Sequence, residues 1–175
     1  RKLEELLKLE NIIIVPGNSD EDPLILKDLG RAVSKHLKKI ITHNSIIGIT
    51  GGTTMAQVAE EMPEGKIAEN LLVIPARGGL GKDVETQSNS IAAKLAKKLQ
   101  ANYRLLHTPD NIDRSTLDAI LKIAEVKEVI ELIDNMNILI FGMGRADTMA
   151  RRRQLPEEKV SNLIEEGAVG EAFGH

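Results

Sequence analysis

Residues 45–59 read SIIGITGGTTMAQVA. The first six residues form a short, apolar stretch rich in β-branched side chains, a composition typical of a buried strand. Two glycines then make a turn, and Met55, Val58 and Ala59 recur at helical spacing. A buried strand that passes through a glycine-rich turn into an amphipathic helix predicts one unit of an α/β fold.

The same alternation continues on both sides of this segment. Further strands are expected at residues 12–15, 71–75, 103–106 and 137–141. Helices are expected at residues 26–39, 91–99, 146–153 and 157–166, with two short ones between 110 and 135. Because the expected strands are apolar throughout, both faces of the sheet should be covered. We therefore predict a parallel sheet with helices on both faces.

The composition excludes several classes of protein. The 175 residues carry 23 basic and 26 acidic side chains, and a net charge of −3 argues against holding nucleic acid by phosphate neutralisation. With one tyrosine, two phenylalanines and no cysteine, base stacking, disulfides and thiolate chemistry are not expected. No apolar run approaches the roughly 20 residues of a membrane span. We expect one domain in the cytoplasm, without a membrane partner.

Both ends of the sequence predict that the chain is a fragment of a longer protein. It begins at Arg1 rather than Met, inside a helical pattern whose mixed charges differ from a signal peptide. The last expected strand is followed only by helices before His175. We expect the sheet, and hence the domain, to be incomplete at the C-terminus.

Three glycine-rich loops follow expected strands, at residues 50–54, 77–81 and 142–144. Loops at the carboxyl ends of parallel strands are where ligands bind in open α/β sheets. Glycines let backbone N–H groups approach an anion, and the two threonines of the first loop add hydroxyl donors. The loop lacks the Gly-Lys-Ser/Thr ending of a P-loop, so nucleotide hydrolysis is not expected. A tight turn with Thr53 as helix cap is the competing interpretation.

Polar side chains near these loops are further candidates. Arg77 follows a strand and offers a planar donor fork to a phosphate, although a surface arginine beside a loop is an equal alternative. Gln87, expected one to two turns into the next helix, can reach sugar hydroxyls or remain solvated. Of the run at 151–153, at most one or two side chains can enter one cleft, since successive helix residues diverge. Solvated cations at a helix end are the alternative there.

Groups that make or break bonds are missing from the sequence. The four histidines lack metal-ligand spacing, and no Gly-x-Ser-x-Gly motif occurs. Asp110 and Asp113 are expected to cap helices, because the EF-hand spacing is absent. We expect no catalytic residue, no metal and no cofactor.

Five segments together resemble a known family. They read GITGGTTMA at 48–56, VIPARGGLG at 73–81, NYRLL at 102–106, TMARRR at 148–153 and GAVGEAFG at 167–174. With these motifs the chain resembles, over essentially its whole length, the effector-binding domain of the SorC family of bacterial transcription regulators. The resemblance implies a Rossmann-like sheet similar to that of glucosamine-6-phosphate deaminase and ribose-5-phosphate isomerase.

The same resemblance implies a function and a set of site residues. Such domains bind phosphorylated sugars as signals without converting them, and fructose 1,6-bisphosphate is the inducer in glycolytic repressors of the family. By matching motif positions, Thr53, Thr54 and their neighbouring glycines would hold one phosphate. Arg77 and Arg152 would supply cations, and Gln87 and Glu171 would contact sugar hydroxyls. The predicted ligand-binding residues are Gly51, Gly52, Thr53, Thr54, Arg77, Gly78, Gly79, Gln87, Arg152 and Glu171.

The resemblance also implies partners and leaves two alternatives. The family's winged helix-turn-helix is absent from this sequence, so operator DNA would be contacted only through a missing N-terminal domain. A homodimer or homotetramer is expected. A sugar-phosphate isomerase or deaminase on the same fold is the first alternative, with Glu171 as its sole candidate base. The second is a dimerisation domain that has lost ligand binding.

Overall fold

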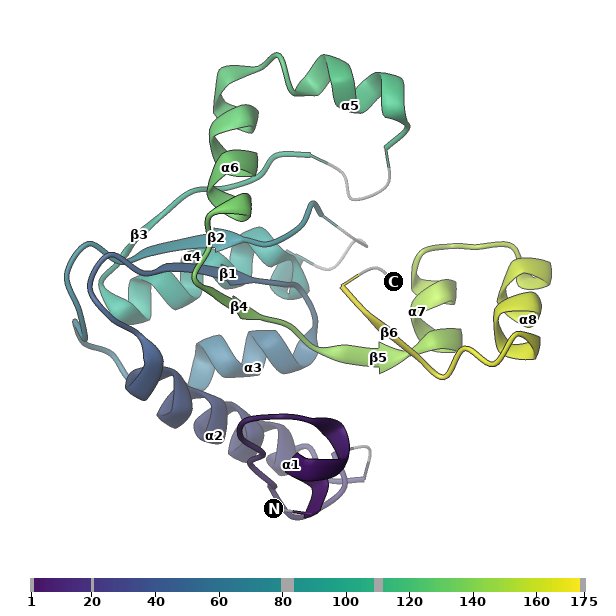
Figure 1. The fold of residues 1–175 in the computed structure, drawn as a ribbon, viewed down its shortest axis with the longest axis horizontal. Helices are drawn as coiled ribbons and strands as arrows, with labels where there is room; N and C mark the ends of the chain where they lie inside the picture. The colour runs from purple at the N-terminus through teal and green to yellow at the C-terminus, as the bar shows by residue number, and fades with distance from the viewer. Residues whose placement is uncertain (1, 20, 80–83, 109–111, 174–175) are drawn as a thin grey trace.

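The computed structural model describes residues 2–19, 21–79, 84–108 and 112–173. Within them, parallel strands form one sheet in the order β3-β2-β1-β4 (Figure 1). The strands are β1 (Ile46–Ile49), β2 (Leu72–Pro75), β3 (Asn102–Tyr103) and β4 (Ile138–Ile140). The predicted α/β fold with a parallel sheet is confirmed.

Helices cover both faces of this sheet, as expected (Figure 1). One face carries α2 (Leu24–Ile40), α3 (Thr53–Glu61) and α4 (Ser88–Leu99). On the other face α6 (Ala124–Asp134) contacts β2, and α5 (Arg114–Ile120) precedes it. A single 3₁₀ turn, η1 (Val84–Thr86), leads into α4, and α1 (Lys2–Leu7) lies near the N-terminus. No helix of the described residues is long and apolar enough to cross a membrane.

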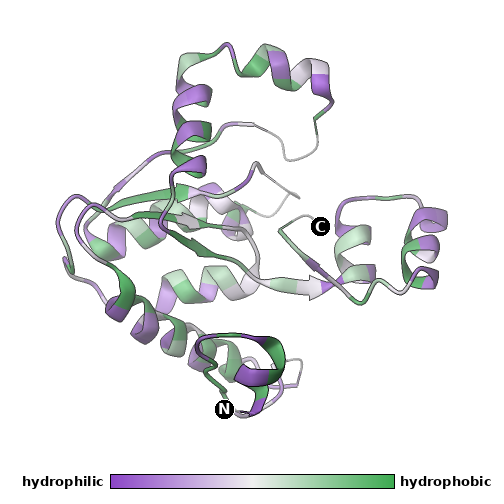
Figure 2. Cartoon of the chain, viewed as in Figure 1, coloured by the Kyte–Doolittle hydropathy of each residue, from purple (hydrophilic) through white to green (hydrophobic). Residues whose placement is uncertain are grey.

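The alternation along β1 divides the core between the two faces. Ile47 and Ile49 are fully buried in the cluster made with α2, α3 and α4. Gly48 faces the opposite side, where an added Cβ would lie 2.5 Å from Met136 Sδ. A side chain at position 48 would therefore have to displace the Met136 thioether, which packs here just after α6. Figure 2 shows the central strands coloured as hydrophobic.

Beyond β4 the chain leaves the sheet and builds a separate unit. The strands β5 (Met143–Arg145) and β6 (Gly170–Ala172) pair antiparallel, and α7 (Ala146–Arg152) and α8 (Glu157–Glu165) lie between them. We call residues 143–173 the α7–α8 lobe, and the β1–β4 sheet with its helices the sheet body. The two helices were predicted, whereas the antiparallel β5–β6 pair was not.

The predicted strand at residues 12–15 is wrong. The segment has no strand partner among the described residues, and the side chains of Ile13 and Ile14 are 55% and 72% exposed. The amide N–H of Ile12 donates to Glu4 Oε1 at 3.2 Å instead of to a neighbouring strand. An apolar β-branched run forms a strand only beside another strand, and residues 13–16 lie beside α2 rather than at an edge of the sheet.

Three other predictions have mixed outcomes. The strand expected at 103–106 ends at Tyr103, because the side chain of Asn89 takes both backbone groups of Leu106 at 3.0 Å. Asp113 caps α5 as predicted, accepting from the amide of Thr116 at 3.0 Å. The hydrogen bond from the Ser115 hydroxyl is the largest cause that lowers the pKa of Asp113, and the hydrogen bond from the Thr116 amide lowers it further. Asp110, Leu80, Gly81 and His175 lie outside the described residues.

Candidate functional site

A cavity of about 440 Å³ opens at the carboxyl ends of β1, β2 and β4. This volume suits a small phosphorylated metabolite. Nine of the ten predicted site residues line it, and only Gly79 does not. The other lining residues are Thr50, Met55, Thr86, Ser88, Gly142, Met143, Gly144, Met149, Gln154 and Phe173. The structure thus brings the predicted residues together, while their contact with a ligand stays a prediction.

The loop between β1 and α3 is shaped by its two glycines. A Cβ on Gly51 would lie 2.6 Å from the carbonyl oxygen of Thr86, so only glycine permits this approach. Gly52 has φ +115° and donates its amide to the same oxygen at 2.9 Å. Gly52 is the N-cap of α3 and has no side chain, so no side chain caps the first N–H groups of this helix. The start of α3 therefore faces the cavity with backbone donors.

A second helix begins at the same cavity. Gln87 is the N-cap of α4, so the prediction that it lies one to two turns inside the helix is wrong. Its extended backbone and the 3₁₀ turn before it delay the helix to Ser88, whose hydroxyl donates to the carbonyl of Arg77 at 3.0 Å. Gly79 lies against Gln87, since an added Cβ would be 3.0 Å from Oε1. The Gln87 side chain lines the cavity without capping α4.

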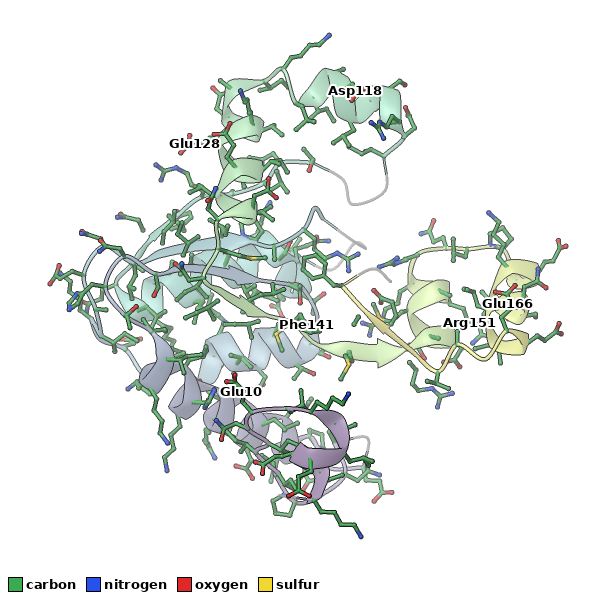
Figure 3. All side chains as sticks on the ribbon, viewed as in Figure 1. Glu10, Asp118, Glu128, Phe141, Arg151 and Glu166 are labelled. Atoms are coloured by element: carbon green, nitrogen blue, oxygen red, sulfur yellow. The ribbon has the colours of Figure 1, made fainter. Side chains whose placement is uncertain are left out.

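The three consecutive arginines at the end of α7 diverge. Arg151, which Figure 3 shows in the α7–α8 lobe, pairs with Glu157 at 2.6 Å and with Asp147 at 3.5 Å. The hydrogen bond between Arg151 and Glu157 raises the pKa of Arg151 and lowers the pKa of Glu157. Arg152 lines the cavity. Arg153, the C-cap of α7, donates to Glu171 at 2.8 Å.

Glu171 lies between two cations that come from different parts of the fold. Its Oε1 is 2.8 Å from Nη2 of Arg153 and 3.7 Å from Nη1 of Arg77. All three side chains are mostly buried, with 22%, 13% and 12% exposed for Arg153, Glu171 and Arg77. Arg77 and Glu171 are among the predicted site residues, whereas Arg153 is not. The sequence signal for Arg153 was its place in the arginine run at 151–153.

An aromatic pair at the cavity was also missed. Phe141 and Phe173 meet edge to face, with ring centroids 6.5 Å apart and an interplanar angle of 83°. The core cluster beneath the sheet contains no aromatic residue, so both phenylalanines of the chain lie away from it. Figure 3 shows Phe141 where the chain passes from β4 toward the α7–α8 lobe. The pair joins the sheet body to β6, two residues from Glu171.

The arrangement is suited to binding anions and hydroxyl groups. Helix N-termini and arginines attract phosphate, a carboxylate accepts from sugar hydroxyls, and Met55, Met149 and Phe173 offer an apolar wall. Among the described residues, no group of three or more histidine, aspartate or glutamate side chains could hold a metal ion.

Comparison with known proteins gives consistent results. The family described as "Putative sugar-binding domain" matches residues 1–175. The "Central glycolytic genes regulator" of Bacillus subtilis is 41% identical over 175 residues, covering 100% of this chain and 52% of that protein. Its namesake from Priestia megaterium is 38% identical over 174 residues, covering 99% and 51%. The chain thus spans about half the length of the curated relatives it matches.

A solved structure extends the likeness to three dimensions. The "putative SorC family transcriptional regulator" of Enterococcus faecalis superposes with a TM-score of 0.89 at 35% identity, covering 99% of this chain and 71% of that one. The resemblance to SorC regulators is therefore confirmed. The names of these relatives are those of transcriptional regulators and not of enzymes.

Proposed function

The chain belongs to the sugar-binding domain family of SorC-type regulators, and on that premise we propose that its cavity senses a sugar carrying two phosphate groups. Fructose 1,6-bisphosphate is the effector we favour. This choice rests on the resemblance and on the cavity, which gathers backbone donors, two threonines and two arginines.

One observation carries the proposal: two helix N-termini and two arginines meet in one cavity. The first set comprises the start of α3 with Thr53 and Thr54. The second comprises Arg77 and the start of α4 on the body side and Arg152 on the lobe side. Each helix terminus adds a partial positive charge to its unsatisfied N–H groups. A sugar with two phosphate groups can contact more of these donors at once than inorganic phosphate can.

In the whole regulator, we propose that effector binding changes operator affinity and the oligomeric state. A ligand shifts such an equilibrium only by as much as its affinity differs between the two states. A homodimer or homotetramer in the cytoplasm fits this role, with a separate domain contacting operator DNA. The glycolytic regulators among the relatives support glycolytic genes as the target.

The test is a thermal-shift titration of this chain with fructose 1,6-bisphosphate, fructose 6-phosphate and inorganic phosphate. At about a hundred times the dissociation constant, binding should stabilise the fold by roughly 2.7 kcal/mol. For a domain of this size that is a rise in melting temperature of about 5–10 °C. No shift with the bisphosphate, or an equal shift with inorganic phosphate, contradicts the proposal.

A pair of neighbouring variants assigns the binding to this cavity. Arg152→Gln removes a lining cation and should abolish most of the shift. Arg151→Gln removes the same charge one residue away, where the side chain pairs with Glu157 and Asp147, and should leave the shift intact. Equal losses in both variants would indicate binding outside the cavity.

A further inference from the structure

Two helices of the chain end in the same way, each at a glutamine with a left-handed backbone. Gln154 follows α7 with φ +58°, and Gln100 is the C-cap of α4 with φ +52°. The amide of the next residue donates five positions back along the chain, at 3.1 Å after Gln154 and at 2.9 Å after Gln100. This is the Schellman motif, in which glycine usually takes the left-handed position because it has no Cβ. A glutamine there strains the backbone at the end of both helices.

The two glutamines differ in where they lie. Gln154 lines the cavity, as does Arg152 two positions earlier, and Gln100 does not. An uninterrupted helix turns each successive side chain by about 100°, so side chains two positions apart would point to nearly opposite sides. The left-handed residue breaks this progression where α7 ends. The strained turn therefore lets Arg152 and Gln154 lie at the same cavity.

The side-chain amide of Gln154 has hydrogen-bonding capacity that the described part of the chain does not use. Gln154 is exposed, and its side chain has no hydrogen-bond partner among the residues that the structure describes. The neighbouring Arg153, in contrast, donates to Glu171 at 2.8 Å. A carboxamide carries two N–H donors and a carbonyl acceptor, which matches a hydroxyl group that both donates and accepts. Position 154 thus offers the cavity an uncharged group suited to a sugar hydroxyl.

We propose that Gln154 is a ligand-contact residue of the cavity, whose side-chain amide hydrogen-bonds a hydroxyl group of the bound phosphorylated sugar. The left-handed turn after α7 places the amide at the cavity and lowers the stability of the ligand-free chain. This inference rests on the proposed function, because it names a further contact made in the same cavity.

Two substitutions at position 154 separate the amide from the backbone. Gln154→Met keeps an unbranched side chain of similar length but removes the donors and the acceptor. Affinity for fructose 1,6-bisphosphate should therefore fall roughly threefold to tenfold. Gln154→Gly should lose a similar factor and, because glycine relieves the left-handed strain, raise the ligand-free melting temperature by roughly 2–4 °C. A merely structural role would not combine higher stability with weaker binding.

Gln100→Gly is the matched control, since it relieves the same strain at a Schellman motif away from the cavity. It should raise the melting temperature to a similar extent and leave the affinity unchanged. Isothermal titration measures the affinities of the wild type and the three variants, and thermal unfolding without ligand measures their stabilities.

Four outcomes overturn the inference while leaving the proposed function standing. In the first, Gln154→Met binds the bisphosphate as the wild type does, so the amide makes no contact. In the second, Gln154→Gly melts below the wild type, so the turn is not strained. In the third, Gln100→Gly weakens binding as much as Gln154→Gly does, so the effect is not local to the cavity. In the fourth, Gln154→Met weakens the binding of inorganic phosphate by the same factor, which assigns the amide to a phosphate instead of a hydroxyl.

The proposed function has a separate test in the same titrations. A wild-type chain that does not bind fructose 1,6-bisphosphate overturns the proposed function itself, whatever the variants do.

Discussion

The sheet body and the α7–α8 lobe supply the same cavity in different ways. The body contributes backbone groups fixed by close packing, such as the Gly51 approach to Thr86 above a fully buried core. The lobe contributes long side chains, including Arg152 and Glu171, and buries few apolar residues of its own: Ala146, Ala150 and Val160. Its links to the body include the Glu171–Arg77 ion pair and the Phe141–Phe173 contact.

The two regions should therefore respond differently to amino-acid substitution. A rigid set of donors and a lightly packed set of side chains together make a site that a ligand can close by bridging them. Substitutions in the body should therefore alter global stability, whereas those in the lobe should alter ligand response and local opening.

The largest expected effect is on the core of the sheet body. Leu95→Ala removes a side chain that is fully buried among α4 and its neighbours, and should lower the free energy of unfolding by about 2–5 kcal/mol. Leu163→Ala in α8, where the side chain is 37% exposed, should cost clearly less. Urea denaturation measures both, and similar losses would show that the lobe is as tightly packed as the body.

Next in size is the steric test of the loop between β1 and α3. Gly51→Ala places a methyl group 2.6 Å from a backbone oxygen, which should cost about 1–3 kcal/mol and weaken bisphosphate binding by shifting η1. Gly142→Ala also lies at the cavity, but its Cβ would meet only Met55 Cε at 3.9 Å. Thermal unfolding with and without ligand should show a loss for Gly51→Ala alone.

The sheet body was largely predictable from sequence, and the lobe was not. Apolar strands and helical periodicity identified β1, β2, β4 and the covering helices, because local patterns determine them. The strand at 12–15 failed because strand formation depends on a partner that local sequence cannot supply. The β5–β6 pair was missed because three-residue strands such as Met143–Arg145 carry too little periodicity.

The candidate site divides in the same way. The glycine-rich loops and Arg77 follow predicted strands, so topology alone brought them to one edge. Arg152 and Glu171 entered through family resemblance, because nothing in their spacing shows that α7 and β6 meet. Arg153 was missed since its role depends on a contact with a residue 18 positions away. The misplacement of Gln87 came from the 3₁₀ turn, which no periodicity indicated.

A smaller effect is expected at the aromatic contact between the regions. Phe141→Leu removes an edge-to-face pair worth about 0.5–1.5 kcal/mol and loosens β6, so the ligand-induced thermal shift should decrease more than ligand-free stability. Tyr103→Leu in β3 is the matched control, with the tyrosine 47% and Phe141 44% exposed. An unchanged ligand response in Phe141→Leu would mean that the lobe is seated by other contacts.

The smallest effect concerns exposed ion pairs, and it distinguishes the regions by local opening rather than by global stability. Hydrogen bonding to Arg151 lowers the pKa of Glu157 in the lobe, and hydrogen bonding to Lys94 lowers that of Glu60 in the body. A lowered pKa means that each pair stabilises the fold above the ordinary glutamate pKa of about 4.3 and loses this as the pH falls through the folded value.

Glu157→Gln should therefore speed amide hydrogen exchange in α8 at pH 6, with a difference from the wild type that shrinks as the pH falls below about 4. Glu60→Gln should leave exchange in α3 nearly unchanged, because Met55, Val58 and Ala59 hold that helix in the core. Exchange followed by mass spectrometry on proteolytic fragments resolves the two helices. Equal acceleration in α3 and α8 would contradict this prediction, because it would show that the buried contacts of α3 protect that helix no better than those of α8 do.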